Sequence, residues 1–231
     1  MNLYRNMFPK PRTMLAVIHA ISEEQVLRNA KIAEEARADG IFLINHQNPA
    51  CDLIIWYAHA RRECPSLWIG LNCLDLDVKD TLTRTPMTVG GLWRDDGGID
   101  DAALDPVAKA REFAELRNRY GTHGIYFGGV AFKHQKKPDD PGKAAHLAMP
   151  YIDVITTSGP ATGYPPSVEK IACMKRAIGK HPLAIASGMT PENVRDFCEY
   201  ADCFLVATGI SKSDTELDAD KIAAFVRAIS A

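Results

Sequence analysis

The sequence predicts an α/β protein, a single (β/α)8 TIM barrel that spans residues 1–231 as one domain. Short apolar runs rich in β-branched residues alternate with amphipathic helical stretches about every 25–30 residues. Eight such pairs fit into 231 residues, which is close to the minimum for this barrel. No linker or low-complexity tract divides the chain. The competing fold, an open doubly wound sheet, usually has fewer strands at this length, and no Gly-x-Gly-x-x-Gly follows the first strand.

The first four predicted strands alternate with helices that carry boundary signals. These strands comprise residues 14–19, 41–45, 67–72 and 89–94. We expect Ser22 to cap the first helix, because its hydroxyl can accept from the free N–H groups of the first turn, and Gly40 to end it. A second helix is predicted over residues 53–62. The fourth strand carries the weakest signal, since Gly90 and Gly91 dilute its apolar run.

The same alternation continues through the second half of the chain. Pro106 begins a helix at a first-turn position, where its missing N–H costs nothing. Thr190 and Pro191 are expected to begin a helix after the seventh strand, with Thr190 as its cap. In the closing helix, Ile222 and Phe225 share one apolar face. The remaining predicted strands comprise residues 124–134, 153–157, 183–187 and 204–208.

Composition and charge exclude several classes of protein. A net charge of −2 and a pI of about 6.4 leave no polycationic field, so we expect no binding to nucleic acid. No run approaches the roughly 18 apolar residues of a membrane span, so we expect no membrane insertion. The first residues lack the apolar segment of a signal peptide, and the six cysteines form no Cys-x-x-Cys. These features predict a cytoplasmic protein with reduced thiols.

Polar side chains gather where the predicted strands end. One such residue alone is typical of a helix cap or a solvated loop, but eight ends that behave alike indicate a site. In a TIM barrel these ends converge on one mouth, where active sites lie. The polar residues at these ends are His19, Asn45, His46, Asn72, Asp75, Arg94, Asp95, Asp96, Lys133, His134, Thr157, Ser158, Ser187, Thr208 and Ser211.

A phosphate site is predicted after the seventh and eighth strands. Ser187, Gly188 and Met189 follow the seventh strand, and Thr208 and Gly209 follow the eighth. Glycines let the backbone approach a ligand closely, and successive free N–H groups form a nest for phosphate oxygens. Many barrels hold a phosphate with these two loops. The alternative is that both glycines only turn the chain.

Catalytic groups are predicted from Lys133 and His134, at the end of the long fifth strand segment. A lysine at a barrel mouth can neutralise an anion or form a Schiff base, and a histidine can transfer protons near neutral pH. The alternative is a solvated basic loop that continues into Lys136 and Lys137. Hydroxyls in the loop after the sixth strand would add substrate contacts. They belong to Thr157, Ser158 and Thr162.

The acidic residues at the strand ends raise the question of a metal. Asp75, Asp95 and Asp96 offer the carboxylate oxygens that suit a hard cation. They show no spacing signature of a metal site. We therefore assign no certain cofactor, with Mg²⁺ as the ion these carboxylates would bind.

Ordered blocks along the chain resemble the BtpA family (BtpA/SgcQ-type proteins), a group of predicted TIM-barrel proteins. The most specific block, SGMTPENV at residues 187–194, is similar to the family's SGVTPENV. Four positions or segments depart from the pattern: 20–22, Gly129, Ser158 and 210–212, so the chain resembles a divergent member. The other matching blocks are residues 17–19, 45, 70–74, 132–134, 158–163, 201–209 and 218–225.

The resemblance and the strand ends together lead to three hypotheses. The first is an isomerase or lyase that acts on a small phosphorylated substrate, of the sugar phosphate or phosphoribosyl type. The backbone at Gly188 and Gly209 would hold the phosphate, and Lys133 and His134 would act on the reacting end. Its orienting and further catalytic side chains would be His19, Asn45, Asn72 and Arg94.

Two alternatives remain at this point. One is a magnesium-dependent mutase or lyase of the phosphonate or phosphoenolpyruvate type, which would use the aspartates. The other is a non-catalytic biogenesis or assembly factor, because the resemblance includes a founding member associated with photosystem I biogenesis. Homo-oligomerisation is compatible with the fold, since barrels often pair through helices or loops, and the sequence singles out no face for it.

Overall fold

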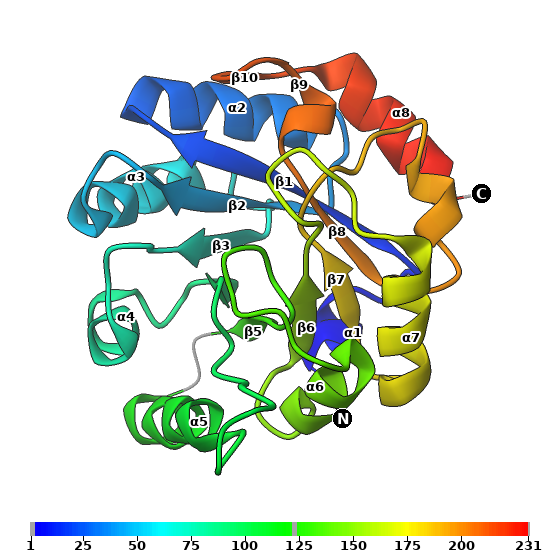
Figure 1. Ribbon diagram of the computed structural model, residues 1–231. Coiled ribbons are helices and arrows are strands. Elements are labelled where there is room, and N and C mark those ends of the chain that lie inside the picture. Colours follow the sequence, from blue (N-terminus) through cyan, green and yellow to red (C-terminus); the bar gives the residue numbers. More distant parts are fainter. Residues whose placement is uncertain (1–2, 122–123, 231) are drawn as a thin grey trace.

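A closed barrel of eight parallel strands forms the centre of the molecule, and its strands follow chain order around the ring (Figure 1). The computed structural model describes residues 3–121 and 124–230. This barrel confirms the predicted fold. The strands are β1 (Thr13–Ala20), β2 (Gly40–Asn45), β3 (Ile69–Asn72), β4 (Gly91–Arg94), β5 (Ile125–Gly129), β6 (Val154–Thr157), β7 (Leu183–Ile185) and β8 (Cys203–Val206).

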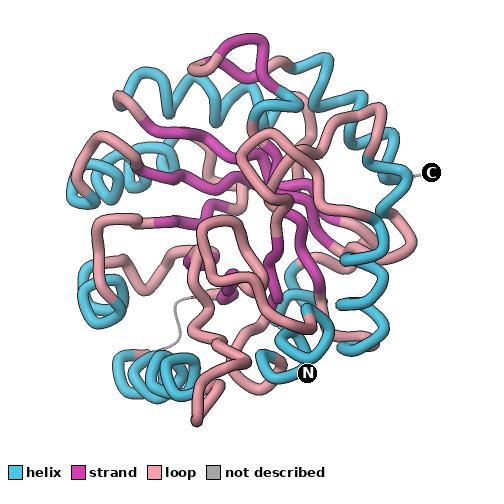
Figure 2. The backbone as a smooth tube through the Cα atoms, in the orientation of Figure 1, coloured by secondary structure: helices cyan, strands magenta, loops and turns pink. Residues whose placement is uncertain are grey.

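A helical segment follows each strand of the barrel, and these segments lie outside the ring (Figure 2). A small hairpin, β9 (Ser211–Ser213) and β10 (Glu216–Leu217), follows β8. The helices are α1 (Leu3–Met7), α2 (Glu23–Glu35), α3 (Ala50–Glu63), α4 (Val78–Arg84), α5 (Ala108–Tyr120), α6 (Pro141–Ala148), α7 (Val168–Ile178) and α8 (Ala219–Ser230), with 3-10 turns η1 (Val194–Phe197) and η2 (Thr208–Ile210).

One predicted helix boundary agrees with the structure and three differ. Gly40 does not end α2, which ends at Glu35, and Pro106 does not begin α5, which begins at Ala108. Ser22 caps α2, since its Oγ accepts from the Gln25 amide at 3.2 Å. The helix expected from Thr190 onward is instead the four-residue turn η1. The Asn193 side chain is the reason: its Oδ1 accepts from the Thr190 amide at 2.9 Å, and its Nδ2 donates to the Gly188 carbonyl at 2.8 Å. These bonds close a local turn in place of a first helical turn.

The fifth strand is shorter than predicted. It ends at Gly129, and residues 130–134 form a loop in which Ala131 and His134 have positive φ values of 51° and 68°. An extended strand cannot contain such residues, because side chains other than glycine rarely adopt the left-handed region. Lys133 and His134 therefore lie on the β5–α6 loop and not on the strand.

The amino-terminal end of the barrel is closed by α1 and aromatic side chains. The Tyr4 hydroxyl donates to the carbonyl of Asp202 at 2.7 Å. Phe42 lies between Trp68 and Phe127 with ring centroids 5.2 Å and 5.1 Å away, in edge-to-face geometry, and Phe8 contacts Trp68. Edge-to-face pairs add to the free energy of burying the rings. This aromatic floor fixes the positions of the strands whose other ends carry the candidate site.

The Asp202 carboxylate joins three elements beside that floor. Its Oδ1 pairs with Arg5 of α1, and its Oδ2 accepts from Lys175 of α7 at 2.6 Å and from the Leu183 amide of β7 at 2.9 Å. The carboxylate is largely buried. A buried carboxylate with this many donors is stable only while its partners remain.

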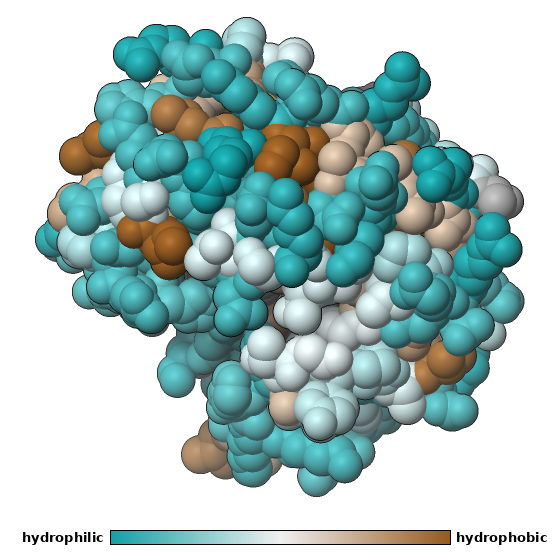
Figure 3. Space-filling view, turned by 90° about the horizontal axis from the view of Figure 1, so that it is seen from above, coloured by the Kyte–Doolittle hydropathy of each residue, from teal (hydrophilic) through white to brown (hydrophobic). Residues whose placement is uncertain are grey.

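The face in Figure 3 is mostly hydrophilic, with hydrophobic residues in separate patches. No helix within residues 3–121 and 124–230 is long and apolar enough to cross a membrane. The six cysteines, all of which lie in these ranges, are free thiols.

Candidate active site

A cavity of about 370 Å³ lies at the carboxyl ends of the barrel strands, and we call it the mouth pocket. Side chains from the ends of β1, β2 and β4 line one part of the pocket, and the loops after β7 and β8, of which β8 neighbours β1 in the ring, line another part. The β5–α6 loop contributes a third side. The polar and glycine residues that line the pocket are His19, His46, Asp95, Lys133, His134, Thr162, Gly163, Ser187, Gly188, Thr208 and Gly209.

Two histidines stack at the ends of β1 and β2. The rings of His19 and His46 are 4.9 Å apart between centroids and only 18° from parallel. Burial, the neighbouring His46 and Lys133 lower the pKa of His19 to about 4. Burial also lowers the pKa of His46, although Asp95 partly opposes that shift. Both imidazoles are therefore neutral at neutral pH, and each can donate or accept one proton.

Asp95 is the acidic group of the mouth pocket. Burial raises the pKa of its carboxyl, and Asn72, Lys133, His46 and His134 oppose that shift. The Asn72 side chain donates to Asp95 Oδ1 at 3.1 Å. Asn72 thus orients the carboxylate, and no hydrogen bond from another described residue reaches the other oxygen, Oδ2. A carboxyl with a raised pKa beside neutral imidazoles is a typical general acid–base arrangement.

Lys133 and His134 both reach the mouth pocket from the β5–α6 loop. The Lys133 ammonium donates to Thr162 Oγ1 at 3.1 Å, and its backbone amide donates to Ser158 Oγ at 2.7 Å. Thr157 Oγ1 donates to the carbonyl of Ala131 at 3.2 Å. The β6–α7 loop therefore holds the strained β5–α6 loop in place.

The hydroxyls predicted as phosphate donors are mostly engaged within the protein. Ser158 accepts from the Lys133 amide and donates to the Gly159 carbonyl at 3.0 Å. Ser187 Oγ donates to the Tyr164 carbonyl at 2.9 Å and accepts from the Gly159 amide at 2.7 Å. These two side chains and Thr157 fix the loops of the mouth, and Ser187 also lines the mouth pocket.

The predicted phosphate loops do meet at the mouth pocket. Gly188 has a φ of 66°, and a Cβ there would collide with the backbone of Tyr164 and Pro165. A Cβ at Gly209 would collide with the carbonyl oxygen of Met189. Both glycines are thus required for loop packing, and the same bare backbone lines the pocket. The amides of Thr208 and Gly209 begin the 3-10 turn η2, where N–H groups have no intrahelical acceptor.

Asn45 and Asp75 form a structural pair beside the pocket and do not line it. Asn45 Nδ2 donates to Asp75 Oδ1 at 2.7 Å, and Asn45 Oδ1 accepts from the Leu74 amide at 2.8 Å. Asp75 Oδ2 accepts from the Ala50 amide at 3.0 Å. These bonds tie the loops after β2 and β3 together. Burial of the carboxylate opposes the shift, but the hydrogen bonds stabilise its charged form and lower the pKa of Asp75.

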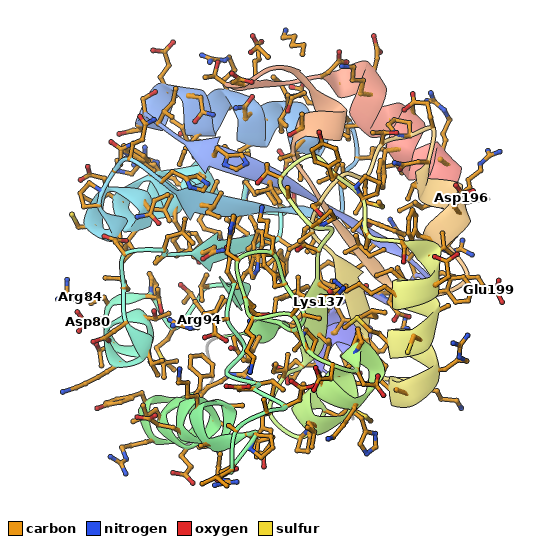
Figure 4. The ribbon with its side chains drawn as sticks, viewed as in Figure 1. Asp80, Arg84, Arg94, Lys137, Asp196 and Glu199 are labelled. Carbon is orange, nitrogen blue, oxygen red and sulfur yellow. The ribbon has the colours of Figure 1, made fainter. Side chains whose placement is uncertain are left out.

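Arg94 lies outside the mouth, contrary to the expectation that it orients the substrate. Figure 4 shows its side chain between α4 and α5, outside the ring of strands. Its guanidinium donates to Thr81 Oγ1 at 3.1 Å and lies over the Phe113 ring at 5.8 Å. The reason is the alternation of side chains along a strand. Trp93 and Asp95 face the barrel interior, so Arg94 faces the helices.

The three aspartates considered for a metal diverge. Asp75 is bound to Asn45, Asp95 faces the mouth pocket, and Asp96 Oδ1 accepts from the Gly98 amide at 2.8 Å and from Gln135 at 3.1 Å. Among the described residues, no group of three or more His, Cys, Asp or Glu side chains could hold a metal ion. The structure brings no support for magnesium at the strand ends.

His46 and the acid–base character of Asp95 are the features that residue types alone missed. Residue type predicts His46 as a polar strand end, and Asp95 as a polar strand end and a metal candidate. The strand period adds that Asp95, two residues after Trp93, points to the same side as Trp93. The structure shows which side that is, since Trp93 packs against Phe42 inside the barrel.

Comparison with known proteins finds a family resemblance in the carboxyl-terminal part of the chain. Residues 129–231 match the model of the BtpA family. The predicted resemblance is confirmed over this segment, which carries Lys133, His134 and the two loops predicted to bind phosphate. An uncharacterised protein of Thermococcus kodakarensis is 29% identical over 82% of this chain and 77% of its own length.

One further relative and one solved structure of similar fold are named enzymes. An N-(5′-phosphoribosyl)anthranilate isomerase of Natronomonas pharaonis is 34% identical over 40% of this chain and 47% of its own length. The structure of (S)-3-O-geranylgeranylglyceryl phosphate synthase from Thermoplasma acidophilum, in complex with its substrate sn-glycerol-1-phosphate, superposes with a TM-score of 0.67. It is 14% identical and covers 99% of this chain and 96% of that one, which shows a shared fold.

Proposed function

We propose that this protein is an enzyme that isomerises a small phosphorylated metabolite by proton transfer at the barrel mouth. One observation carries the proposal. A single cavity of about 370 Å³ joins a wall of bare glycine backbone, at Gly188 and Gly209, to a wall with Asp95, His19 and His46. The first wall suits an oxyanion, and the second suits acid–base chemistry. The volume falls within the usual range of small-molecule sites, roughly 300–1,000 Å³.

The phosphate of the substrate would lie against the loops after β7 and β8. Backbone N–H groups at Thr208 and Gly209 would donate to its oxygens without a side chain in between. The Lys133 ammonium, on the rim of the same pocket, would offset part of its charge. Binding at one end would hold the reacting carbon near Asp95, since such positioning is a large part of catalysis.

The reacting end would lie against Asp95 and His46. Asp95 Oδ2 would take a proton from the carbon next to a carbonyl, and the neutral His46 would give a proton to the carbonyl oxygen. The resulting enediol would collapse when the protonated Asp95 delivers its proton to the neighbouring carbon and His46 recovers a proton from the adjacent hydroxyl. His19, stacked on His46, would favour the neutral imidazole. The step conserves atoms and needs no cofactor.

The comparisons support this proposal at a coarser level. The Natronomonas relative is named as an isomerase of a phosphoribosyl compound, and the Thermoplasma structure holds a glycerol phosphate. A lyase reaction through a Schiff base on Lys133 is the nearest variant, because this lysine lies at the same pocket. Borohydride trapping with the bound metabolite, followed by mass spectrometry, separates the two: the isomerase proposal expects no adduct on Lys133.

A deuterium-exchange experiment tests the proposal. Purified protein is screened against phosphorylated sugars and phosphoribosyl compounds by thermal shift, since a ligand at 100 times its Kd stabilises a fold by about 2.7 kcal/mol. Each hit is then incubated in D₂O, and deuterium uptake at carbon is followed by NMR. We expect Asp95→Asn to lose about 10²-fold or more of this exchange while it still binds the ligand.

Asp96→Asn is the matched control. Asp96 is the next residue and has its carboxylate bound to Gly98 and Gln135, away from the mouth pocket. Its exchange rate should equal that of the wild type. Exchange at the wild-type rate in Asp95→Asn, or no stabilisation by any phosphorylated compound, contradicts the proposed function.

A further inference from the structure

A second cavity, of about 350 Å³, lies between the β5–α6 and β6–α7 loops, and we call it the lysine pocket. It shares Lys133 and His134 with the mouth pocket, but Lys137 and Lys170 line only the lysine pocket of the two. Figure 4 shows Lys137 on the loop that follows β5. Of the described residues that line this cavity, none is Asp or Glu. The cavity therefore carries cationic groups without acidic partners.

Lys170 is the unusual group of the lysine pocket. It comes from the first turn of α7, and its ammonium donates to the carbonyls of Ala131 at 2.6 Å and of Ser158 at 2.7 Å. Neutral carbonyls satisfy hydrogen bonds but do not cancel the charge. An ammonium has three N–H donors, so one remains for a ligand.

The electrostatics of Lys170 agree with this geometry. Burial and the like charge of Lys137 lower the pKa of Lys170 to about 8. The first turn of α7, capped by Ser167, adds the partial positive charge of a helix N-terminus to the same cavity. The two ammonium groups and the helix N-terminus all favour a negative charge, and none of the described residues that line the cavity is a carboxylate.

We propose that the lysine pocket is an anion-binding site that takes a phosphoryl group, with Lys170 and Lys137 as its cationic ligands. The anion would accept a hydrogen bond from the third N–H of Lys170 and would pair with Lys137. Without the anion, the charge of Lys137 repels the ammonium of Lys170. Because Lys170 also holds the carbonyls of both loops, an anion there would stabilise the loop that carries Lys133 and His134 beside the mouth. This site does not depend on the proposed isomerase function, since neither Lys137 nor Lys170 lines the mouth pocket.

NMR titration of the lysine side chains with inorganic phosphate tests this site. Lys170 is labelled with ¹³C and titrated in phosphate and in sodium chloride of equal ionic strength. Phosphate should raise the pKa of Lys170 by about half a unit or more, because an opposite charge favours the ammonium form. Lys137→Gln keeps both carbonyl bonds of Lys170, so it should fold, and it should bind phosphate at least about fivefold more weakly.

Lys136→Gln is the matched control, since Lys136 is the adjacent lysine and does not line the lysine pocket. It should bind phosphate like the wild type. Thr208→Glu places a negative charge in the mouth pocket and should leave the Lys170 response intact, which separates this site from the proposed phosphate site of the enzyme. The proposal is overturned if phosphate and chloride give the same Lys170 titration, or if Lys137→Gln and Lys136→Gln bind phosphate equally well.

Discussion

The two ends of the barrel differ in what their side chains do. At the amino-terminal end, Phe42, Trp68 and Phe127 pack edge to face, and Asp202 has a donor for each oxygen. At the carboxyl-terminal end, partial burial lowers the pKa of His19 to about 4 and raises the pKa of Asp95. The first end lowers the free energy of the fold. The second holds groups in states that burial disfavours, which is typical of functional sites.

Backbone geometry shows the same contrast. Ala131 and His134, two of the three non-glycine residues with positive φ in the described chain, lie on one loop of the mouth. Thr157, Ser158 and Lys170 hold that loop by hydrogen bonds. Strain that is held by surrounding bonds is a property of sites that must present side chains in one orientation.

The largest effect should come from removing an aromatic ring at the amino-terminal end. Phe127 is fully buried among Tyr4, Phe42 and Trp68. Phe127→Ala should lower the free energy of unfolding by about 3–5 kcal/mol, since it removes buried surface and leaves a cavity. Urea denaturation measures it. A loss below about 1 kcal/mol would contradict the account of this end, whereas ligand affinity of the folded fraction should stay unchanged.

The next effect concerns charge pairs. Asp202→Asn should cost about 2–3 kcal/mol, because Lys175 would lose the charge that compensates its own partly buried ammonium. The matched control is Asp80→Asn, which breaks the exposed pair with Arg84 at 2.8 Å on α4 (Figure 4). That pair should contribute only about 0.3–0.5 kcal/mol. Equal losses in the two variants would argue against a structural role for the Asp202 network.

The effect that is smallest at neutral pH should appear at the mouth, because it develops only as the pH falls. The pKa of His19 is about 4 in the folded protein, against an ordinary value near 6.5, so the unfolded chain binds a proton that the folded chain excludes. Wild-type stability should therefore fall as pH drops from about 6.5 towards 4. His19→Gln should flatten this slope, and His59→Gln, a histidine paired with Glu23 on the helix surface, serves as the comparison. An unchanged slope in His19→Gln would contradict a neutral buried His19.

The fold was largely predictable because it repeats. Eight apolar runs with helices between them leave few alternatives, and local signals such as Ser22 add confirmation. Helix α1 was not predicted, since five residues are too short for a periodic signal. Tertiary contacts of Tyr4, such as its hydrogen bond to the Asp202 carbonyl, hold this helix against the barrel. The turn η1 replaced a helix because the bonds of Asn193 outweigh the start signal at Thr190.

The site was predictable in place but less so in detail. The strand ends pointed to the mouth, yet hydroxyls such as Ser158 and Ser187 serve the loops, and Asn45 pairs with Asp75. Residue type cannot distinguish a side chain that binds a ligand from one that holds a loop. The alternation of side chains along a strand predicts that Arg94 faces the opposite side from Trp93 and Asp95. The hydrogen-bond partner of each polar side chain depends on contacts between residues far apart in the sequence, which no local pattern shows.

The most direct test of the account compares the two ends in one experiment. A ¹H–¹⁵N spectrum is recorded while the protein is titrated with a phosphorylated compound that stabilises it. We predict shifts for the amides of Gly188, Thr208 and Gly209 and for residues beside Asp95, and none for Leu183, whose amide is bound to Asp202 at the amino-terminal end. Saturable binding that leaves the amides of Gly188, Thr208 and Gly209 unmoved would contradict a phosphate site at the mouth.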